Sequence, residues 1–177
     1  CHLMPCVAAI GALVEQFGAT AVLCTATQPV LGDLIQRFAP SHAISEICPQ
    51  IPFYFDKFRR VTFRQVGVLE DDALAELLCA HEQVLCIVNS RKAAQSIFSK
   101  LPEEGSFHLS TLMVPAHRRT VLEEIRRRLN DGLPCRVVST SLVEAGVDID
   151  FPAVYRELAG LDSILQAAGR CNREGKR

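Results

Sequence analysis

The chain has 177 residues, of which 49% are hydrophobic and 22% are charged, and its formal net charge is −1. This composition is typical of a globular protein with a sizeable core, and it excludes a protein that binds nucleic acid through an overall basic charge. No apolar run reaches membrane-spanning length and no signal peptide with a basic leading region is found, so we expect a cytoplasmic protein with no membrane partner.

The eight cysteines are scattered through the chain and form no Cys-x-x-Cys pair. Several of them, such as Cys24, Cys86 and Cys135, lie in apolar runs. We therefore expect reduced, buried cysteines rather than disulfides. No set of cysteines and histidines has the spacing typical of zinc ligands, so no metal site is expected.

The first 48 residues predict two helices with a strand between them. Apolar residues recur at helical spacing from Leu3 to Phe17, and Gly18 is a typical helix stop. The apolar run 19–25 predicts a short buried strand, and a second helix is expected over about 30–38. The chain opens without an initiator methionine, which we interpret as one indication of a fragment.

The next segment, 39–55, has three prolines and no clear periodicity. This pattern is typical of a linker or an extended connection. We therefore divide the chain into a first part at 1–48, a linker at 49–57 and a second domain at 58–177.

Strand and helix patterns alternate through this second domain. Alternating or continuous apolar runs predict strands at 59–66, at 84–88, at 106–111 and from Cys135 onward. Helices are expected from Asp71 to near His81, from Asn89 or Ser90 to Lys100, and from Pro115 to Leu129, with Asp71 and Asp72 as caps of the first. The basic run Arg126–Arg128 in the last turn of the third helix is expected to be solvated. Such alternation predicts an α/β fold, in which a parallel sheet is covered by helices on both faces.

The last part of the chain carries the charged groups of a candidate site. Gly146 can take a positive φ in a turn, and the carboxylates of Asp148 and Asp150 follow on alternate positions. Arg170 and Arg173 stand three residues apart on a predicted helix, so we expect both guanidinium groups on one face. Two fixed cations beside carboxylates and hydroxyls favour a polyanionic ligand, and a triphosphate is the natural candidate.

The same residues resemble sequence motifs of superfamily-2 helicases. Gln166, Gly169, Arg170 and Arg173 fit the pattern Gln-x-x-Gly-Arg-x-x-Arg of motif VI. The runs 142–148, 84–90 and 25–29 resemble motifs V, IV and III. In particular, the chain is similar to the helicase–nuclease of type I CRISPR interference systems, with most similarity to the type I-C branch.

The resemblance implies a domain organisation. Residues 1–48 would be the C-terminal tail of a first RecA-like domain, and 58–177 would be a second RecA-like domain that ends just after motif VI. It also implies partners: single-stranded DNA, a missing N-terminal helicase and nuclease half, and a CRISPR surveillance complex.

The resemblance further implies roles for single residues. Arg173 would be the arginine finger on the γ-phosphate of ATP, with Arg170 beside it on the phosphates and Gln166 positioning the attacking water or the γ-phosphate. Asp148 would hold the ribose or a coupling network, and Gly146 and Gly169 also belong to the nucleotide-binding positions. The side chains that would grip the backbone of single-stranded DNA are Asn89, Ser110, Thr111 and Thr140.

Half of the chemistry of such an enzyme is missing from the sequence. The chain has no Asp-Glu dipeptide and no adjacent His-Asp pair, which would bind the metals of the helicase and the nuclease. Gly169 to Lys176 is not a phosphate loop, because five residues instead of four separate its glycines and Arg177 stands in the place of Ser or Thr. We therefore expect ATP and Mg²⁺ only in the full-length enzyme, and no cofactor in the isolated chain.

Three interpretations of function stay open. The first is a fragment of an ATP-dependent DNA translocase of CRISPR interference, which is inactive alone. The second is a stand-alone, non-catalytic module that binds nucleic acid or a partner protein. The third is a different superfamily-2 translocase. The runs 158–164 and 169–173 make it less favoured, because they resemble the CRISPR family more than other superfamily-2 helicases.

Overall fold

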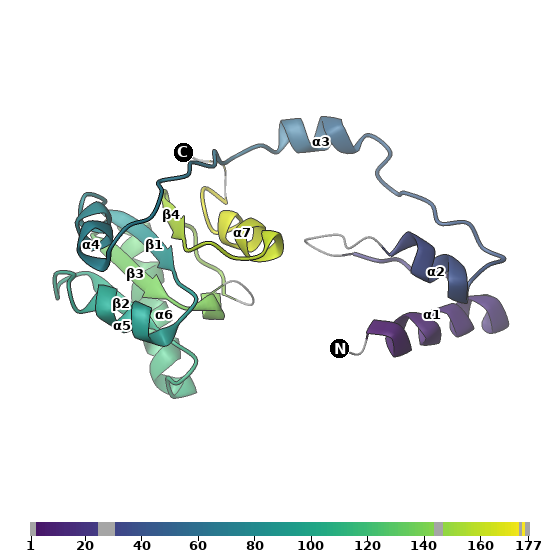
Figure 1. Ribbon diagram of the computed structural model, residues 1–177, viewed down its shortest axis with the longest axis horizontal. Coiled ribbons are helices and arrows are strands. Elements are labelled where there is room, and N and C mark those ends of the chain that lie inside the picture. The colour runs from purple at the N-terminus through teal and green to yellow at the C-terminus, as the bar shows by residue number, and fades with distance from the viewer. Residues whose placement is uncertain (1–2, 25–30, 144–146, 174, 176–177) are drawn as a thin grey trace. The chain divides into compact units, whose positions relative to one another are not determined.

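The computed structural model describes residues 3–24, 31–143, 147–173 and 175, and it divides the chain into two compact units. The first unit is Cys1–Arg59 and the second is Arg60–Arg177. Figure 1 labels their helices and strands. None of the helices within the described residues combines the length and the apolar character needed to cross a membrane.

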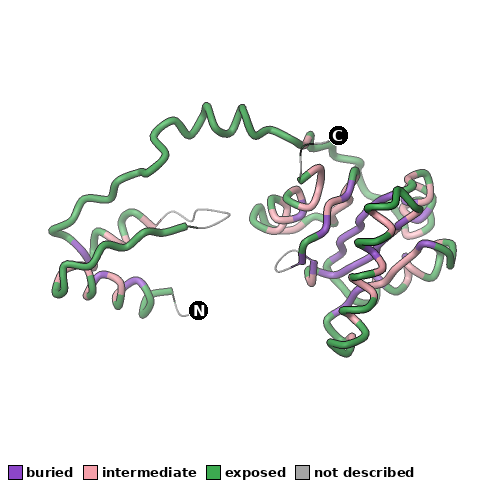
Figure 2. Tube along the Cα trace, turned by 180° about the vertical axis from the view of Figure 1, so that it is seen from behind, coloured by how far each residue is buried: buried purple, intermediate pink, exposed green. Residues whose placement is uncertain are grey.

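The first unit consists of three helices, α1 (Leu3–Phe17), α2 (Gly32–Phe38) and α3 (Ile51–Lys57). Its small core lies where α1 meets the end of α2, around Val7, Gly11 and Ala39. A Cβ atom on Gly11 would lie 2.6 Å from the carbonyl oxygen of Phe38, so only glycine permits this close approach. Most of this unit is exposed, as the green tube in Figure 2 shows.

The strand predicted at 19–25 is wrong for its described part, because residues 19–24 form no strand and are exposed. A β-strand must pair its backbone groups with a neighbour, and no described strand pairs with this run. Cys24, which the strand would have buried, is exposed. The following positions, 25–30, lie outside the described residues, and with them the motif III resemblance.

The segment interpreted as a linker or an extended connection contains the helix α3. Pro52 lies in its first turn, where the missing N–H of proline costs no hydrogen bond. All residues of α3 are exposed, so the helix lacks a buried face.

The second unit is built on a sheet of four parallel strands in the order β2-β3-β1-β4. The strands are β1 (Gln83–Ile87), β2 (Ser106–Leu109), β3 (Cys135–Ser139) and β4 (Val154–Arg156). The central strand β1 is buried along its whole length, as an apolar run in a parallel sheet should be. The predicted α/β fold with a parallel sheet is confirmed.

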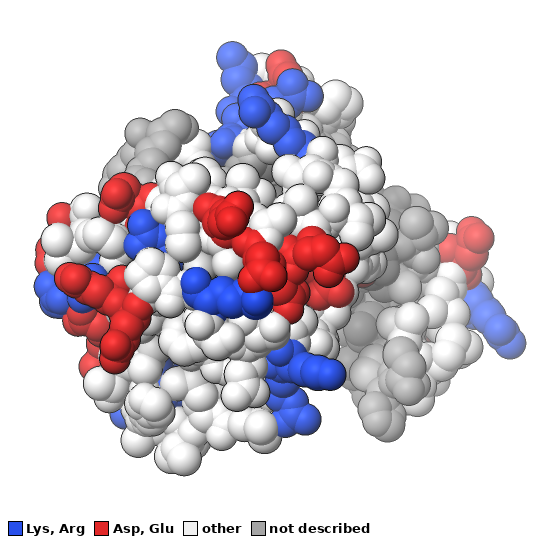
Figure 3. All heavy atoms as spheres, turned by 60° about the vertical axis from the view of Figure 1, so that its left-hand side comes forward, with Lys and Arg blue, Asp and Glu red and all other residues white. Residues whose placement is uncertain are grey.

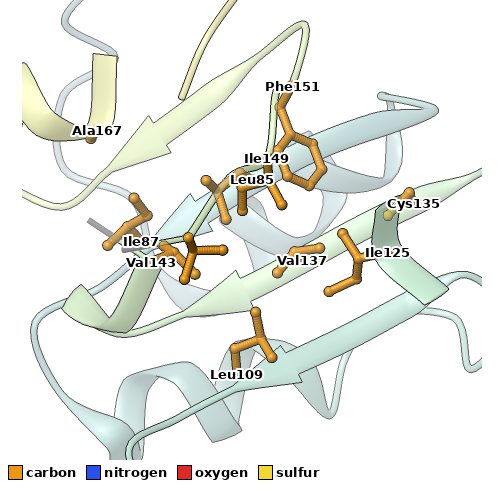
Figure 4. Packing of buried hydrophobic residues seen from close by; sticks show 11 residues of the cluster. Leu85, Ile87, Leu109, Ile125, Cys135, Val137, Val143, Ile149, Phe151 and Ala167 are labelled. Carbon is orange, nitrogen blue, oxygen red and sulfur yellow. The ribbon is translucent and has the colours of Figure 1, made fainter. Parts of the chain in front are cut away.

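Helices cover both faces of this sheet. Leu78 of α4 (Asp71–Cys79) and Ile97 of α5 (Arg91–Phe98) pack with Val84 and Cys86 on one face. On the other face, α6 (Pro115–Asn130) and α7 (Leu161–Ala168) contribute to a larger core. Figure 4 shows this core, whose residues include Leu85, Ile87, Leu109, Ile125, Val137, Val143, Ile149, Phe151 and Ala167.

Two local predictions for this unit are wrong. Residues 59–66 form no strand, and apart from Val61 they are exposed, because no strand of the sheet pairs with them.

Asp71 and Asp72 lie inside the first turn of α4 instead of capping it, and Glu70 is the N-cap. Their negative charges still favour this helix end through the helix dipole. Ser90 caps α5 as predicted, because its Oγ accepts a hydrogen bond from the Ala93 N–H at 3.1 Å.

The described cysteines are free thiols, as expected, but only two are fully buried. Burial raises the pKa of Cys86 and of Cys135 to about 12, which keeps both thiols protonated and unreactive near neutral pH. Cys6, Cys24 and Cys48 are exposed, so the expectation of buried cysteines is wrong for the first unit.

Candidate nucleotide and nucleic-acid site

The four residues predicted to contact DNA follow the ends of three strands. Asn89 comes two residues after β1, Ser110 and Thr111 follow β2, and Thr140 follows β3. Because the strands are parallel, their carboxyl ends meet at one edge of the sheet (Figure 1). Ligands of open α/β sheets bind at this edge.

Asn89 connects the ends of two neighbouring strands. Its side-chain Nδ2 donates to the carbonyl oxygen of Leu158 at 2.8 Å, and its Oδ1 accepts from Nη1 of Arg156 at 2.7 Å. Its backbone N–H donates to the Glu157 carboxylate at 2.6 Å. The amide of Asn89 is therefore engaged in joining β1 to β4.

The hydroxyl groups at this edge differ in exposure. Thr111 is exposed, whereas Ser110 and Thr140 are only 6% and 7% exposed. Oγ1 of Thr140 is buried and has no hydrogen-bond partner within the described part of the chain. A buried hydroxyl without a partner costs free energy. A ligand oxygen that reached Thr140 would supply the missing hydrogen bond.

Arg170 and Arg173 do not lie on a helix, which corrects the sequence prediction. The helix α7 carries Gln166, which is half-buried, but it ends at Ala168 with Gly169 as its C-cap. The chain then turns back onto the segment before β4, where the Phe151 N–H donates to the Arg170 carbonyl oxygen at 2.9 Å. The two arginines come together through this turn rather than through helical spacing.

Arg170 is half-buried beside the end of the 3₁₀ turn Ser141–Val143. Its Nε donates to the carbonyl oxygen of Val143 at 3.0 Å. Burial and the nearby positive charge of Arg173 lower the pKa of Arg170, while Asp148 opposes this shift. Both arginines lie on the turn that follows α7.

Arg173 is held by both carboxylates that precede β4. Its Nη1 pairs with Oδ1 of Asp148, and its backbone N–H donates to Oδ1 of Asp150 at 2.7 Å. The preceding residue, Asn172, has a φ of 46°, in the left-handed region that asparagine tolerates better than most residues. Sequence reasoning missed this role of Asn172, although asparagine is one of the residues that adopt the left-handed region most readily.

Arg126 is exposed, as its position near a helix end predicts, but its side chain also makes a contact that the sequence did not indicate. Its Nε donates to the carbonyl oxygen of Asp148 at 3.0 Å, so it supports the segment that pairs with Arg173. The neighbouring Arg127 instead pairs with Glu124 and Asp131 on α6 itself. Gly146, the remaining predicted site residue, lies outside the described residues.

The comparisons with known proteins identify the family. The profile of "CRISPR-associated nuclease/helicase Cas3, C-terminal" matches residues 80–176, which is more than half of the chain. The chain belongs to this family. The match includes the three strand-end hydroxyl residues and the two arginines, and it confirms the resemblance to CRISPR helicase–nucleases.

Two curated relatives carry the same name. The Cas3 nuclease/helicase of Haloferax volcanii is 46% identical over 59 residues, which are 33% of this chain and 6% of the relative. That of Methanothermobacter thermautotrophicus is 28% identical over 105 residues, which are 58% of this chain and 13% of the relative. The chain therefore matches only a small part of the length of these relatives.

The fold resembles that of a solved Cas3. The crystal structure of T. fusca Cas3 with ATP matches 62% of this chain and 15% of its own chain, with a TM-score of 0.50 and 21% sequence identity. At this identity the likeness concerns the fold, which is that of a RecA-like helicase domain.

The donor set of the second unit fits the phosphate end of a nucleoside triphosphate. Guanidinium N–H groups match phosphate oxygens, and Arg170 and Arg173 lie on the same turn after α7. No group of three or more His, Cys, Asp or Glu side chains that could hold a metal ion is found in the described ranges. The two arginines thus fit the phosphate side of a nucleotide site.

Proposed function

We propose that this chain supplies one side of the ATP site of a Cas3 helicase, with Arg173 as the arginine finger. The observation that carries the proposal is that Arg173 is bound to both Asp148 and Asp150 on the turn that also carries Arg170. Membership in the Cas3 family supports ATP as the anion and CRISPR interference as the context.

The side chain of Arg173 suits this role because it can leave its present partner. Its ion pair with Asp148 is exposed, with 46% of the arginine and 82% of the aspartate side chain accessible. Exposed ion pairs contribute only about 0–1 kcal/mol, so a γ-phosphate could replace Asp148 at small cost. Bound ATP supplies a phosphoryl group whose negative charge is stabilised by positive side chains during transfer.

The other side of the site has to come from another domain. The sequence has no phosphate loop and no Asp-Glu dipeptide for Mg²⁺. Arg170 would neutralise phosphate charge next to Arg173, and Gln166 on α7 would orient the attacking water. The name "assembled helicase" is used below for this chain joined to a domain that carries the phosphate loop.

We also propose that single-stranded DNA runs along the carboxyl edge of the sheet. The exposed hydroxyl of Thr111 and the buried, unpartnered hydroxyl of Thr140 are the groups that would meet its phosphates. Asn89 would act by holding this edge together, since its amide already joins β1 to β4. In a CRISPR system, a surveillance complex would deliver the DNA.

The test of the finger is the steady-state ATPase rate of the assembled helicase with saturating single-stranded DNA. Arg173→Lys keeps the charge but loses the planar fork, so it should lose most of the roughly 10³–10⁵-fold that an arginine finger contributes. The KM for ATP should change much less, because the phosphate loop binds the ground state.

Arg127→Lys is the matched control, because Arg127 is exposed and pairs with Glu124 of α6 and with Asp131, the C-cap of that helix. It should leave the turnover rate nearly intact. If Arg173→Lys stays within about threefold of the parent, which is only ~0.7 kcal/mol in the barrier, Arg173 is not the finger.

A further inference from the structure

Both polar groups of the Arg173 main chain are engaged by charged side chains. The Arg173 N–H donates to Oδ1 of Asp150 at 2.7 Å, and the Arg173 carbonyl oxygen accepts a hydrogen bond from Nη1 of Arg60. The two partners come from distant parts of the second unit, since Asp150 precedes β4 and Arg60 is its first residue. A carboxylate on an N–H and a guanidinium on a carbonyl are both charge-assisted hydrogen bonds, which are about twice as strong as neutral ones.

Arg60 is itself fixed by the turn that it supports. The Asn172 Nδ2 donates to the carbonyl oxygen of Arg60 at 3.1 Å. Gly175, whose N–H donates to the Asn172 carbonyl oxygen at 3.0 Å, lies against the Arg60 side chain. Arg60 therefore contacts the turn through its backbone and through the stem of its side chain. Both contacts help to hold its guanidinium beside the Arg173 carbonyl oxygen.

The side chain of Arg173 is held less firmly than its main chain. The guanidinium has one exposed ion pair with Asp148, and 46% of the side chain is accessible. Solvent screens such a pair, and its loss costs little. The arrangement fixes the point from which the side chain extends and leaves the guanidinium able to move.

We propose that Arg60 and Asp150 are positioning residues that clamp the main chain of Arg173 so that its guanidinium reaches the γ-phosphate from a fixed point. This inference rests on the proposed function, in which Arg173 is the arginine finger. A group that acts on a transition state must be placed within about 0.5 Å, and a displacement of about 1 Å can cost on the order of 10²-fold in rate. Loss of either contact therefore lowers turnover without removing the finger.

The test compares the ATPase of the assembled helicase between truncating and conservative variants. Arg60→Ala and Asp150→Ala each remove one contact, and we expect kcat to fall at least about tenfold while the KM for ATP stays within about twofold. Arg60→Lys can still donate to the carbonyl oxygen, and Asp150→Asn can still accept from the N–H, so both should restore most of the rate. Arg59→Ala is the control, because the adjacent Arg59 is exposed and hydrogen-bonds to the Asp56 carbonyl oxygen through its backbone N–H.

A second readout uses the chain alone. Amide hydrogen exchange at Arg173 should be faster in Asp150→Ala and Arg60→Ala than in the parent and in Arg59→Ala, with unchanged exchange in β1 and β3. The clamp is overturned if Arg60→Ala and Asp150→Ala keep kcat within about twofold while Arg173→Lys loses its rate, and the finger then stands. If Arg173→Lys also keeps its rate, the finger and the clamp both fail.

Discussion

Gly105 stands at the start of β2, where the chain passes close to the residue before β3. Its φ is 75°, and an added Cβ would lie 2.6 Å from the carbonyl oxygen of Pro134. The Gly105 carbonyl oxygen also accepts from the Arg136 N–H at 2.7 Å, which begins the pairing of β2 with β3. A left-handed φ and a close contact coincide at this position, and both require glycine.

Gly105→Ala should therefore destabilise the second unit more than Gly132→Ala does. Gly132 has a similar φ of 70° but nothing within 4 Å of an added Cβ, so it pays only the left-handed penalty of about 1–2 kcal/mol. The additional clash at Gly105 has to be relieved by moving backbone. Urea unfolding of both variants measures the difference, and equal midpoints would contradict the steric account.

The motif around Arg170 and Arg173 illustrates how far single residues can be interpreted from sequence. The motif pattern predicts that the two arginines share one site. It does not predict the turn that holds them. The pairing of Phe151 with the residues on both sides of Cys171 bends the chain after α7. Such a contact joins residues about twenty positions apart, and no local pattern encodes it. The roles of these arginines stay predictions.

At the scale of elements, strand patterns succeeded only where a neighbour was present. The runs at 84–88 and after Cys135 lie side by side in the sheet as β1 and β3. The runs 19–24 and 59–66 have similarly apolar or alternating patterns, yet no described strand pairs with them and they stay irregular. Periodicity indicates which face of a segment is apolar, whereas strand pairing requires a neighbouring strand from elsewhere in the chain.

The carboxyl edge of the sheet gives a prediction about DNA binding. Thr140→Val keeps the shape of the side chain and removes a hydroxyl that has no partner within the described residues, so the melting temperature of the chain should stay equal or rise. If this hydroxyl meets a phosphate, the mutation removes a hydrogen bond to a charged group, which contributes about 1.5–3 kcal/mol. Affinity of the assembled helicase for labelled oligo-dT, measured by fluorescence anisotropy, should fall about tenfold or more.

Thr120→Val on α6 is the control, because its hydroxyl bonds to the Ala116 carbonyl oxygen of the same helix. Unchanged oligo-dT affinity in Thr140→Val would show that DNA does not contact Thr140.

The helix α6 carries a carboxylate whose pKa is strongly shifted. Hydrogen bonds from Arg127 and then Arg128 lower the pKa of Glu124 from 4.5 to about 2. The folded-state pKa is depressed, so the stabilising contribution of Glu124 is complete above about pH 4.5 and is lost as pH falls toward about 2.

Glu124→Gln should therefore lower the urea midpoint at pH 6, and this deficit should shrink as the pH is lowered toward 3. Since the group is part-exposed, the deficit should also shrink in high salt. Glu123→Gln, at the exposed neighbouring position, provides the comparison. A deficit of Glu124→Gln that is the same at pH 6 and pH 3 would contradict the ion-pair account.

At the scale of the whole molecule, positive and negative charges nearly balance. The face in Figure 3 carries acidic and basic side chains close together with wide uncharged areas between them, and the formal net charge is −1. We therefore expect weak long-range attraction to DNA, and the proposed binding would rely on local groups such as those at the carboxyl edge. The division into Cys1–Arg59 and Arg60–Arg177 separates the arginine site from the first three helices in the chain.

We propose that this chain contributes arginines to a nucleotide site whose phosphate loop lies in another domain. The most direct measurement is DNA-stimulated ATP hydrolysis by three samples: the chain alone, the phosphate-loop domain alone, and the assembled helicase. Turnover is expected only in the assembled helicase, because each part alone lacks groups that phosphoryl transfer needs. Hydrolysis by the isolated chain, or by the phosphate-loop domain as fast as by the assembled helicase, would contradict it.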